Sequence, residues 1–459
     1  MDKTVDTSEN IVTLPGVKLE LEPKIPTPKS DKIIENAKKL KKLSKYPCDF
    51  DFETYRKLEL RFGHEQPRGG ITFNTPLKLV NSHSTCQQCL YAFEIDTYGR
   101  GCTHDCVYCY AKAELTAHGY WNRPFPMPVD ISQIWKIFYT VFETDKKSKW
   151  RDVLEKRVPV RIGSMSDSFM YMDKKYKVTQ ELLKLLNYYN YPYIIFTRSD
   201  LVAHDDYLEL LNPDLCSVQM SIASTNDELN RMIEPGTPNA KKRLKALQKL
   251  VRNGFWTTVR INPFFPIYPD GYFTDPNFDK DSMPKPFNFS SFEMVDEITS
   301  YGVQSILAGM VRLSGFSLNQ IEKATGRNLR KFYREDNKKN SRDFHYSDKE
   351  IRAYYERIHA KCIQNGVQFT TCYIGNGENH FWKDQDLWSN KKDCCNAISR
   401  VKAFKNPKTS RDIPWQTRMK HTSHKCLTPV DEMNLHTPLE KPLLIEKNSI
   451  SINPDFTSI

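Results

Sequence analysis

Three cysteines lie within eight residues in the segment Gly-Cys-Thr-His-Asp-Cys-Val-Tyr-Cys, at Cys102, Cys106 and Cys109. The spacing Cys-x3-Cys-x2-Cys supplies three thiolates from one short loop, one fewer than a closed tetrahedral zinc or iron–sulfur site needs. A cubane cluster held by three cysteines leaves one iron open, and an open coordination position is where chemistry can occur. The spacing therefore predicts a [4Fe-4S] cluster with one iron available to a further ligand.

A zinc site is the main alternative for these cysteines. Cys86 and Cys89, together with Cys102 and Cys106, approximate the four-cysteine zinc spacing Cys-x2-Cys-x12-Cys-x3-Cys. This assignment leaves Cys109 without a role, and it does not account for the strand and helix pattern described below. It would correspond to a zinc-dependent nucleic-acid-binding protein without catalytic chemistry. Cys86 and Cys89 could also form a redox pair.

A second group of cysteines lies toward the end of the chain. Cys372 follows a late strand candidate, and Cys394 and Cys395 are adjacent in the sequence. A strand-end cysteine with two neighbouring cysteines predicts a second metal site, for which an auxiliary iron–sulfur cluster and a zinc ion are both open. Cys426 could complete it. The alternative is that these thiols are buried and bind nothing.

Composition and charge limit the class of protein. The 459 residues include no run near the roughly 18 apolar residues that a membrane span needs, and the polar start lacks a secretory signal, so we expect a cytoplasmic protein with no membrane partner. Twelve cysteines bunched in motifs are typical of metal binding in a reducing cytosol rather than of a disulfide framework. The formal charge of +11 suits an anionic or nucleic-acid substrate, although a lysine-rich solvated surface explains it equally well.

The middle of the chain alternates strand and helix signals, which indicates parallel strands joined by helical crossovers. In barrels of this type the functional residues lie at the carboxyl ends of the strands, and the cysteine loop follows the first strand. The predicted strands are 90–97, 158–163, 193–197, 215–222, 256–261 and 303–307, with 367–371 as a later candidate. The predicted helices are 110–118, 178–189, 205–211, 226–232 and 240–253.

The cysteine loop, with Gly101 before it and Tyr108 before its last cysteine, resembles the signature of the radical S-adenosylmethionine (radical SAM) enzymes. From about Asp96 to Pro266 the chain resembles the spore-photoproduct-lyase-like branch of that superfamily. The matching stretches are Gly-Cys-x3-Cys-Val-Tyr-Cys-Tyr-Ala, Gly163-Ser-Met-Ser-Asp167, Phe196-Thr-Arg-Ser199, Ser221-Ile-Ala-Ser224, Glu234-Pro-Gly236 and Arg260-Ile-Asn-Pro263.

The resemblance implies an α/β fold, a partial (β/α)6 TIM-like barrel of the radical SAM type with N- and C-terminal extensions. It implies that a [4Fe-4S] cluster on Cys102, Cys106 and Cys109 binds SAM at its open iron and cleaves it reductively to a 5′-deoxyadenosyl radical, which abstracts a hydrogen atom. An electron donor such as a flavodoxin or a reductase would be a partner. The zinc-dependent binding protein without radical chemistry is the alternative function.

SAM carries an amino group, a carboxylate, a ribose and an adenine, so its site needs hydroxyl, carboxylate and cationic partners. By resemblance and by their positions after strands, we expect the cofactor-binding residues to be Tyr108, Gly163, Ser164, Ser166, Asp167, Ser221, Arg260 and Asn262. The alternatives are ordinary turn residues for 163–167 and a surface charge for Arg260. We assign no catalytic residue from the sequence.

Five segments follow from these patterns. We expect a flexible basic N-terminal segment at 1–45, an N-terminal extension at 46–89, the radical SAM core barrel at 90–310, a C-terminal extension carrying the second cysteine group at 311–435, and a tail at 436–459. A long aromatic loop at 264–287 could be a lid over the barrel mouth or a packed structural loop.

The sequence does not identify the substrate. Charge and loop aromatics favour a nucleic acid or a modified nucleotide, and a peptide or small metabolite is the rival. Spore photoproduct lyases carry a hydrogen-donating cysteine after the cluster motif, whereas here no cysteine occurs between Cys109 and Cys216. Cys216 begins a strand, where a buried structural thiol is expected. We therefore do not expect repair of DNA photolesions.

Overall fold

The structure is a computed structural model of the chain. It describes residues 11–14, 17–20, 77–79, 91, 93–99, 101–117, 121, 126–129, 131–338, 341–372, 384–390 and 393–404.

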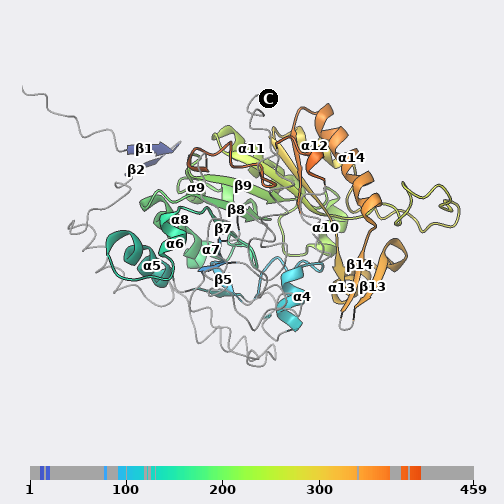
Figure 1. Cartoon of the computed structure of the whole chain (residues 1–459), viewed down its shortest axis with the longest axis horizontal. Coiled ribbons are helices and arrows are strands. Elements are labelled where there is room, and N and C mark those ends of the chain that lie inside the picture. Colours follow the sequence, from blue (N-terminus) through green and yellow to red (C-terminus); the bar gives the residue numbers. More distant parts are fainter. Residues whose placement is uncertain are drawn as a thin grey trace, which may run out of the picture.

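An eight-stranded sheet forms the centre of the molecule, with the strand order β15-β11-β10-β9-β8-β7-β4-β3. Seven of these strands pair in parallel, and β3 joins the edge antiparallel to β4. Figure 1 shows the strands side by side through the middle of the molecule. Their bounds are β3 Leu77–Leu79, β4 Phe93–Ile95, β7 Val160–Ile162, β8 Tyr193–Thr197, β9 Cys216–Ser221, β10 Trp256–Phe264, β11 Ser305–Met310 and β15 Gln368–Thr371.

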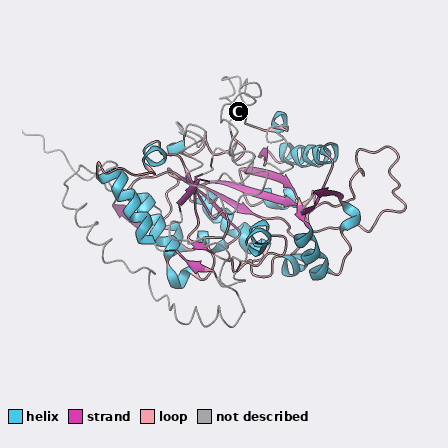
Figure 2. Cartoon of the chain, turned by 60° about the horizontal axis from the view of Figure 1, so that its bottom comes forward, coloured by secondary structure: helices cyan, strands magenta, loops and turns pink. Residues whose placement is uncertain are grey.

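The parallel strands follow one another in chain order from β4 to β15, and helices occupy most of the connections between them. Figure 2 shows the strands in the interior with helices around them. The helices are α4 Tyr110–Ala117, α5 Ile131–Glu143, α6 Arg151–Glu155, α7 Asp173–Tyr176, α8 Val178–Tyr188, α9 Asp205–Leu208, α10 Asp227–Ile233, α11 Ala240–Arg252, α12 Met294–Thr299, α13 Gly315–Thr325 and α14 Asp348–Gln364. The 3-10 helices are η2 Asp200–Ala203, η3 Arg330–Phe332, η4 Gln385–Leu387 and η5 Lys402–Phe404.

This sequential parallel order confirms the predicted α/β fold with a partial TIM-like barrel. The six strands expected between 90 and 310 are present, and the later candidate is β15, which pairs in parallel with β11 and extends the same sheet. Part of the expected C-terminal extension therefore belongs to the sheet.

Helix α11 illustrates how the sequence specifies these elements. The side chain of Asn239 caps its first turn by accepting a hydrogen bond from the backbone N–H of Lys242 at 2.9 Å. Ala240, Leu244 and Leu247 are buried at helical spacing, which turns this face of the helix toward the core. Strand β9 is buried along its whole length, as expected for a parallel strand covered on both faces.

Several short elements are absent from our sequence predictions. A three-stranded antiparallel sheet has the order β12-β14-β13, and two further strand pairs are β1 with β2 and β5 with β6. Most of these strands are too short or too polar to show a recognisable alternation in the sequence. Their bounds are β1 Ile11–Leu14, β2 Val17–Glu20, β5 Tyr98–Gly99, β6 Met127–Pro128, β12 Leu313–Ser314, β13 Arg334–Lys338 and β14 Ser341–His345.

Residues 384–390 and 393–404, which we call the inner segment, pack against side chains of the central strands. The Gln219 side chain of β9 donates to the Cys395 carbonyl at 2.9 Å, and the Thr370 hydroxyl of β15 donates to the Cys394 carbonyl at 2.6 Å. Asn396 donates to the Ser305 hydroxyl of β11 at 3.0 Å. Three different strands thus hold a segment that lies far away in the sequence.

The aromatic loop at 264–287 packs on the protein. The rings of Tyr268 and Tyr272 stack with centroids 4.0 Å apart, and Phe273 meets Tyr354 of α14 edge to face at 5.1 Å. The Arg357 guanidinium lies 3.6 Å from the centroid of the Phe273 ring. These contacts favour the packed structural loop over the lid.

No helix among the described residues is long and apolar enough to cross a membrane.

Candidate active site

A cavity of about 430 Å³ lies at the carboxyl ends of the parallel strands. The loops or strand ends that follow β7, β8, β9, β10 and β11 all contribute to its lining. The three cysteines of the first motif line it, and so does each cofactor-binding residue that the sequence predicts: Tyr108, Gly163, Ser164, Ser166, Asp167, Ser221, Arg260 and Asn262. Among the described residues that line this cavity, none comes from the loop at 264–287.

Backbone hydrogen bonds fold the cysteine loop into two turns. The Asp105 amide donates to the Cys102 carbonyl at 3.3 Å, and the Cys109 amide donates to the Cys106 carbonyl at 3.2 Å. Burial raises the pKa of all three thiols, that of Cys102 to about 12, so without a metal they stay protonated at neutral pH. Iron that binds here must displace those protons.

The donor set fits an iron–sulfur cluster. Cys102, Cys106 and Cys109 are close enough for each charge to disfavour ionisation of a neighbouring thiol. No three His, Cys, Asp or Glu side chains within the described part of the chain converge as ligands of a metal ion. Each cysteine of a cubane binds a different iron, so cluster ligands need not converge on one point.

His104, between the first two cysteines, anchors the loop to two other segments. Its Nδ1 lies 3.0 Å from the Gly236 carbonyl oxygen, and its Nε2 lies 3.1 Å from Asp167 Oδ2. Both partners can only accept, so both contacts are hydrogen bonds only when both ring nitrogens carry a proton. The Gly236 amide returns a hydrogen bond to the His104 carbonyl at 3.0 Å.

Gly236 is needed because the cysteine loop lies against it. A Cβ atom at this position would lie 2.0 Å from the Thr103 carbonyl oxygen and 2.8 Å from the His104 Cα. Only glycine permits such close approach of two backbones. The Glu234-Pro-Gly236 stretch therefore shapes the cysteine loop.

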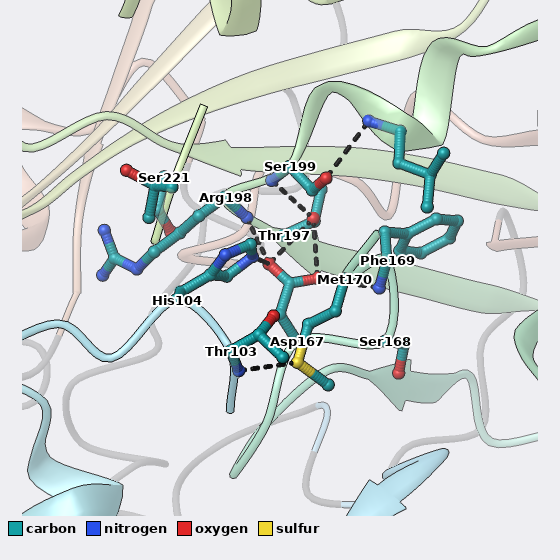
Figure 3. A network of polar contacts seen from close by, with 12 residues as sticks. Thr103, His104, Asp167, Ser168, Phe169, Met170, Thr197, Arg198, Ser199 and Ser221 are labelled. Atoms are coloured by element: carbon teal, nitrogen blue, oxygen red, sulfur yellow. Dashed lines mark hydrogen bonds and ion pairs between the residues drawn. The ribbon is translucent and has the colours of Figure 1, made fainter. Parts of the chain in front are cut away.

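Asp167 joins the loop after β7 to the end of β8 (Figure 3). Its carboxylate accepts hydrogen bonds from the Arg198 amide at 2.6 Å, the Thr197 hydroxyl at 2.8 Å and the Phe169 amide at 2.9 Å. Burial opposes ionisation of Asp167, but the hydrogen bonds from His104 and the amides outweigh it and lower its pKa. The carboxylate of Asp167 engages protein donors, which suits a residue that positions the cysteine loop, and cofactor binding by Asp167 stays a prediction.

The loop at 163–166 is held in a similar way. Asp96 accepts hydrogen bonds from the amides of Ser164 at 2.8 Å and Met165 at 3.1 Å. Gly163 has φ +85°, and a Cβ atom there would lie 2.3 Å from the Phe196 carbonyl oxygen. The Ser166 hydroxyl donates to the Tyr98 carbonyl at 2.7 Å. The backbone of this loop thus approaches the cavity in a fixed conformation.

A buried carboxylate, Glu234, lies behind Tyr108. The Tyr108 hydroxyl donates to it, Arg198 lies 3.1 Å from its Oε1, and Arg243 lies 2.8 Å from its Oε2. Burial raises the pKa of Glu234, but the charges of Arg243 and Arg198 prevail and lower it. The Arg198 guanidinium lies 5.3 Å from the Tyr108 ring centroid. Tyr108 is therefore fixed at both its ring and its hydroxyl.

Arg260 and Ser221 also line the cavity. Arg260 donates to the Gln219 side chain at 2.7 Å, contacts the Cys372 sulfur at 3.6 Å and lies 4.6 Å from the Phe196 ring centroid. Among the described residues Arg260 pairs with no carboxylate, and the Ser221 hydroxyl has no hydrogen-bond partner. Both groups are therefore available to a polar ligand.

The second cysteine group lies beside Arg260. Cys394 and Cys395 are buried, and Cys372 is the residue that contacts the Arg260 guanidinium. A hydrogen bond from Cys394, assisted by the Arg260 charge, lowers the pKa of Cys395 despite its burial. The structure brings the three thiols to one region of the barrel but does not gather them as ligands of one metal ion. Cys86, Cys89 and Cys426 lie outside the described residues.

Several residues of the cavity escaped the sequence analysis. His104, Arg161, Arg198 and Trp121 line it, and Glu234 supports it. His104 and Arg198 stand within or beside motifs that we quoted, so their position was a usable signal. Trp121 and Arg161 carry no local signal that distinguishes them from core or surface residues.

Comparisons with known proteins agree with the cysteine motif. Residues 97–273 match the model of the Radical SAM superfamily. An uncharacterized protein of Acidianus two-tailed virus is 26% identical over 236 residues, covering 48% of this chain and 68% of the relative. An uncharacterized protein of Methanocaldococcus jannaschii is 27% identical over 170 residues, covering 36% and 58%. One of Mycobacterium tuberculosis is 25% identical over 207 residues, covering 44% and 58%.

Solved structures with a similar arrangement include a spore photoproduct lyase, with a TM-score of 0.45 and 14% identity over 77% of this chain and 99% of that one. A radical SAM methyltransferase from Kitasatospora setae with cobalamin and a [4Fe-4S] cluster bound has a TM-score of 0.38 and 11% identity over 63% and 53%. The matched residues 97–273 hold the cysteine loop and the strand ends that line the cavity up to β10. Residues 97–273 are thus similar to the Radical SAM superfamily, as the cysteine motif predicted.

Proposed function

We propose that the protein is a radical SAM enzyme that binds a [4Fe-4S] cluster through Cys102, Cys106 and Cys109 and cleaves SAM reductively to a 5′-deoxyadenosyl radical for hydrogen abstraction. One observation carries the proposal: the three cysteines and every predicted SAM-binding residue line a single cavity within a radical SAM domain.

The residues of the cavity divide the work of binding. The cysteines hold the cluster, and Tyr108 forms a fixed aromatic wall beside it. Arg260 offers a guanidinium to the SAM carboxylate, while Ser221 and Asn262 offer hydroxyl and amide groups to its polar atoms. When bound, the cluster and SAM supply the electron and the radical, and the protein supplies geometry.

Other residues position the binding groups and exclude water. His104 and Asp167 fix the cysteine loop, and the buried Glu234 fixes Tyr108. Gln219 accepts a hydrogen bond from Arg260 and donates to the Cys395 carbonyl, while Thr370 donates to the Cys394 carbonyl, so the inner segment is held next to Arg260. Packing of this kind would limit quenching of a radical by solvent.

For the substrate we propose a nucleic acid or a modified nucleotide. Four arginines among the described residues line the cavity. Arg161, Arg198 and Arg312 are each paired with a carboxylate, and Arg260 is assigned to the SAM carboxylate. The proposed substrate therefore rests on the formal charge of +11 and on no unpaired arginine of the cavity. A peptide or small metabolite is the alternative outcome of a substrate screen.

Repair of DNA photolesions is not part of the proposal. Cys216 is buried and is the first residue of β9. The cavity lies at the carboxyl ends of the parallel strands, which is the opposite end of β9. A thiol in that place is remote from a substrate radical formed in the cavity.

We propose the electron donor, the cellular location and the domain bounds as the sequence predicts them. We propose a flavodoxin or a reductase as the electron donor and the cytoplasm as the location. We also propose residues 90–310 as the catalytic core and 311–435 as an extension that completes the sheet through β15.

Metal analysis of anaerobically reconstituted protein tests the proposal. We expect iron and sulfide in cubane proportion, and loss of that cluster when Cys102, Cys106 and Cys109 are all replaced by Ala. Stoichiometric zinc without iron in anaerobic protein would favour the zinc-dependent binding protein instead.

A further inference from the structure

Trp121 is a buried residue of the cavity wall beside the cysteine loop. Its side chain is 6% exposed and packs with Leu115 of α4 against Cys102 and Met165. Its backbone amide donates to the Leu115 carbonyl at 3.2 Å, which fixes the residue against the end of α4. Trp121 also lines the cavity. The indole is therefore held beside the first cysteine of the motif.

Among the described residues, the indole N–H of Trp121 has no acceptor. Its nitrogen is buried and makes no hydrogen bond to the Cys102 sulfur or to any other atom of the described part of the chain. An indole nitrogen is a donor only, and buried donors in folded proteins are nearly always paired. Cys102 packs against the cluster that Trp121 forms with Leu115, and both Trp121 and Cys102 line the cavity, so an acceptor bound at that cysteine is a candidate partner for the N–H.

We propose that the Trp121 N–H donates a hydrogen bond to a sulfur atom of the iron–sulfur cluster next to Cys102, and so raises the reduction potential of the cluster. This inference rests on the proposed function. Hydrogen bonds to the sulfur atoms are among the features that set the potential of such clusters. A donor stabilises the reduced cluster more than the oxidised one, because the reduced cluster carries one more negative charge. Trp121 is thus a positioning and tuning residue.

The variant Trp121→Phe retains an aromatic ring and removes the N–H. Potentiometric titration of the cluster without SAM should then show a more negative midpoint. At the wild-type midpoint the reduced fraction should fall from half to about a tenth, a roughly ten-fold change in the equilibrium constant that corresponds to about 59 mV for one electron. Trp256→Phe is the matched control, because its indole N–H is also buried without an acceptor but lies elsewhere in the barrel. We expect it to leave the midpoint unchanged.

A second measurement does not depend on a variant that folds. In wild-type protein with tryptophan labelled with ¹⁵N in the indole, pulsed electron paramagnetic resonance of the reduced cluster should detect one coupled nitrogen. That coupling should disappear in Trp121→Phe and persist in Trp256→Phe.

Equal midpoints in Trp121→Phe and wild type at equal iron content would overturn the inference, as would the absence of nitrogen coupling in the labelled wild type. Weaker SAM binding by Trp121→Phe at an unchanged midpoint would also overturn it, because the N–H would then serve SAM. In each of these cases the wild-type protein has still assembled its iron–sulfur cluster, so the proposed function is not contradicted. A wild type that assembles no cluster would overturn the proposed function and this inference together.

Discussion

His104 and Asp167 are 63 positions apart in the sequence, and the imidazole Nε2 of one lies 3.1 Å from the carboxylate Oδ2 of the other. The contact ties the cysteine loop to the loop that follows β7, and Asp167 in turn holds the end of β8 through Thr197 and Arg198. Three segments that line the cavity are joined through one carboxylate. The geometry of the cysteine loop therefore depends on residues that are not themselves ligands.

Replacing Gly236 by Ala tests the fit between the two backbones. The new Cβ would lie 2.0 Å from the Thr103 carbonyl oxygen, so the cysteine loop must shift. We expect a loss of about 1–3 kcal/mol in the free energy of unfolding, the usual cost of overpacking, and a lower iron content after reconstitution. Thr237→Ala is the control, because it removes hydrogen bonds to the Glu234 carbonyl (3.0 Å) and to the Glu234 carboxylate (3.3 Å) without adding atoms beside the loop. Full iron content in Gly236→Ala would contradict this account.

Glu234→Gln tests the buried charge behind Tyr108. The variant leaves Arg198 and Arg243 without their carboxylate, so we expect it to lose about 3–5 kcal/mol of unfolding free energy at pH 7. The pKa of Glu234 is lowered in the folded protein, so its stabilisation is complete above the pKa of an unfolded Glu, about 4.3, and is lost as the pH falls through the lower folded value.

Denaturant unfolding of wild type and Glu234→Gln between pH 7 and pH 3 checks both points. The difference between the two proteins should stay constant down to about pH 5 and shrink below about pH 4. A difference that disappears already between pH 7 and pH 5 would mean that the Glu234 pKa is raised, contrary to the ion pairs.

Arg260→Gln tests the assignment of the SAM carboxylate. Removing the guanidinium should weaken SAM binding by about 1.5–3 kcal/mol, the scale of a hydrogen bond to a charged group. Arg312→Gln is the control, because Arg312 also lines the cavity but is paired with Asp343 at 2.5 Å. Equilibrium binding of SAM to the reconstituted proteins measures the effect. Equal affinities in wild type and Arg260→Gln would remove Arg260 from the SAM site.

The second cysteine group makes a separate prediction. We expect Cys372, Cys394 and Cys395 to bind a metal. A variant in which all three cysteines of the first motif are replaced by Ala should therefore retain iron or zinc. Binding requires Cys372 to turn from Arg260, which it contacts at 3.6 Å. A folded variant without metal would show that these thiols are structural.

The strands and the cysteine motif could be predicted because their signals are local. Strand β8 was predicted with its observed bounds. Helix α11 was predicted with its observed start, and it ends one residue earlier than predicted. We did not predict α5, although Ile131, Ile134 and Phe138 recur at helical spacing and are buried.

Long-range contacts could not be predicted from the sequence. Gln219 and Cys395 are 176 positions apart, and nothing local marks either as the partner of the other. Glu234 begins a stretch that we quoted, Glu234-Pro-Gly236, but its role as the ion-pair partner of Arg198 and Arg243 becomes visible only in the folded structure. Most of the proposed cofactor-binding residues follow strand ends, whereas supporting groups such as Glu234 and the inner segment lie elsewhere in the chain.

Formation of 5′-deoxyadenosine tests the central claim most directly. Reconstituted protein reduced with dithionite and supplied with SAM should release 5′-deoxyadenosine and methionine, even without substrate, and the variant lacking Cys102, Cys106 and Cys109 should release neither. Wild-type protein that carries a full [4Fe-4S] cluster and binds SAM, yet forms no 5′-deoxyadenosine under reduction, would contradict the account.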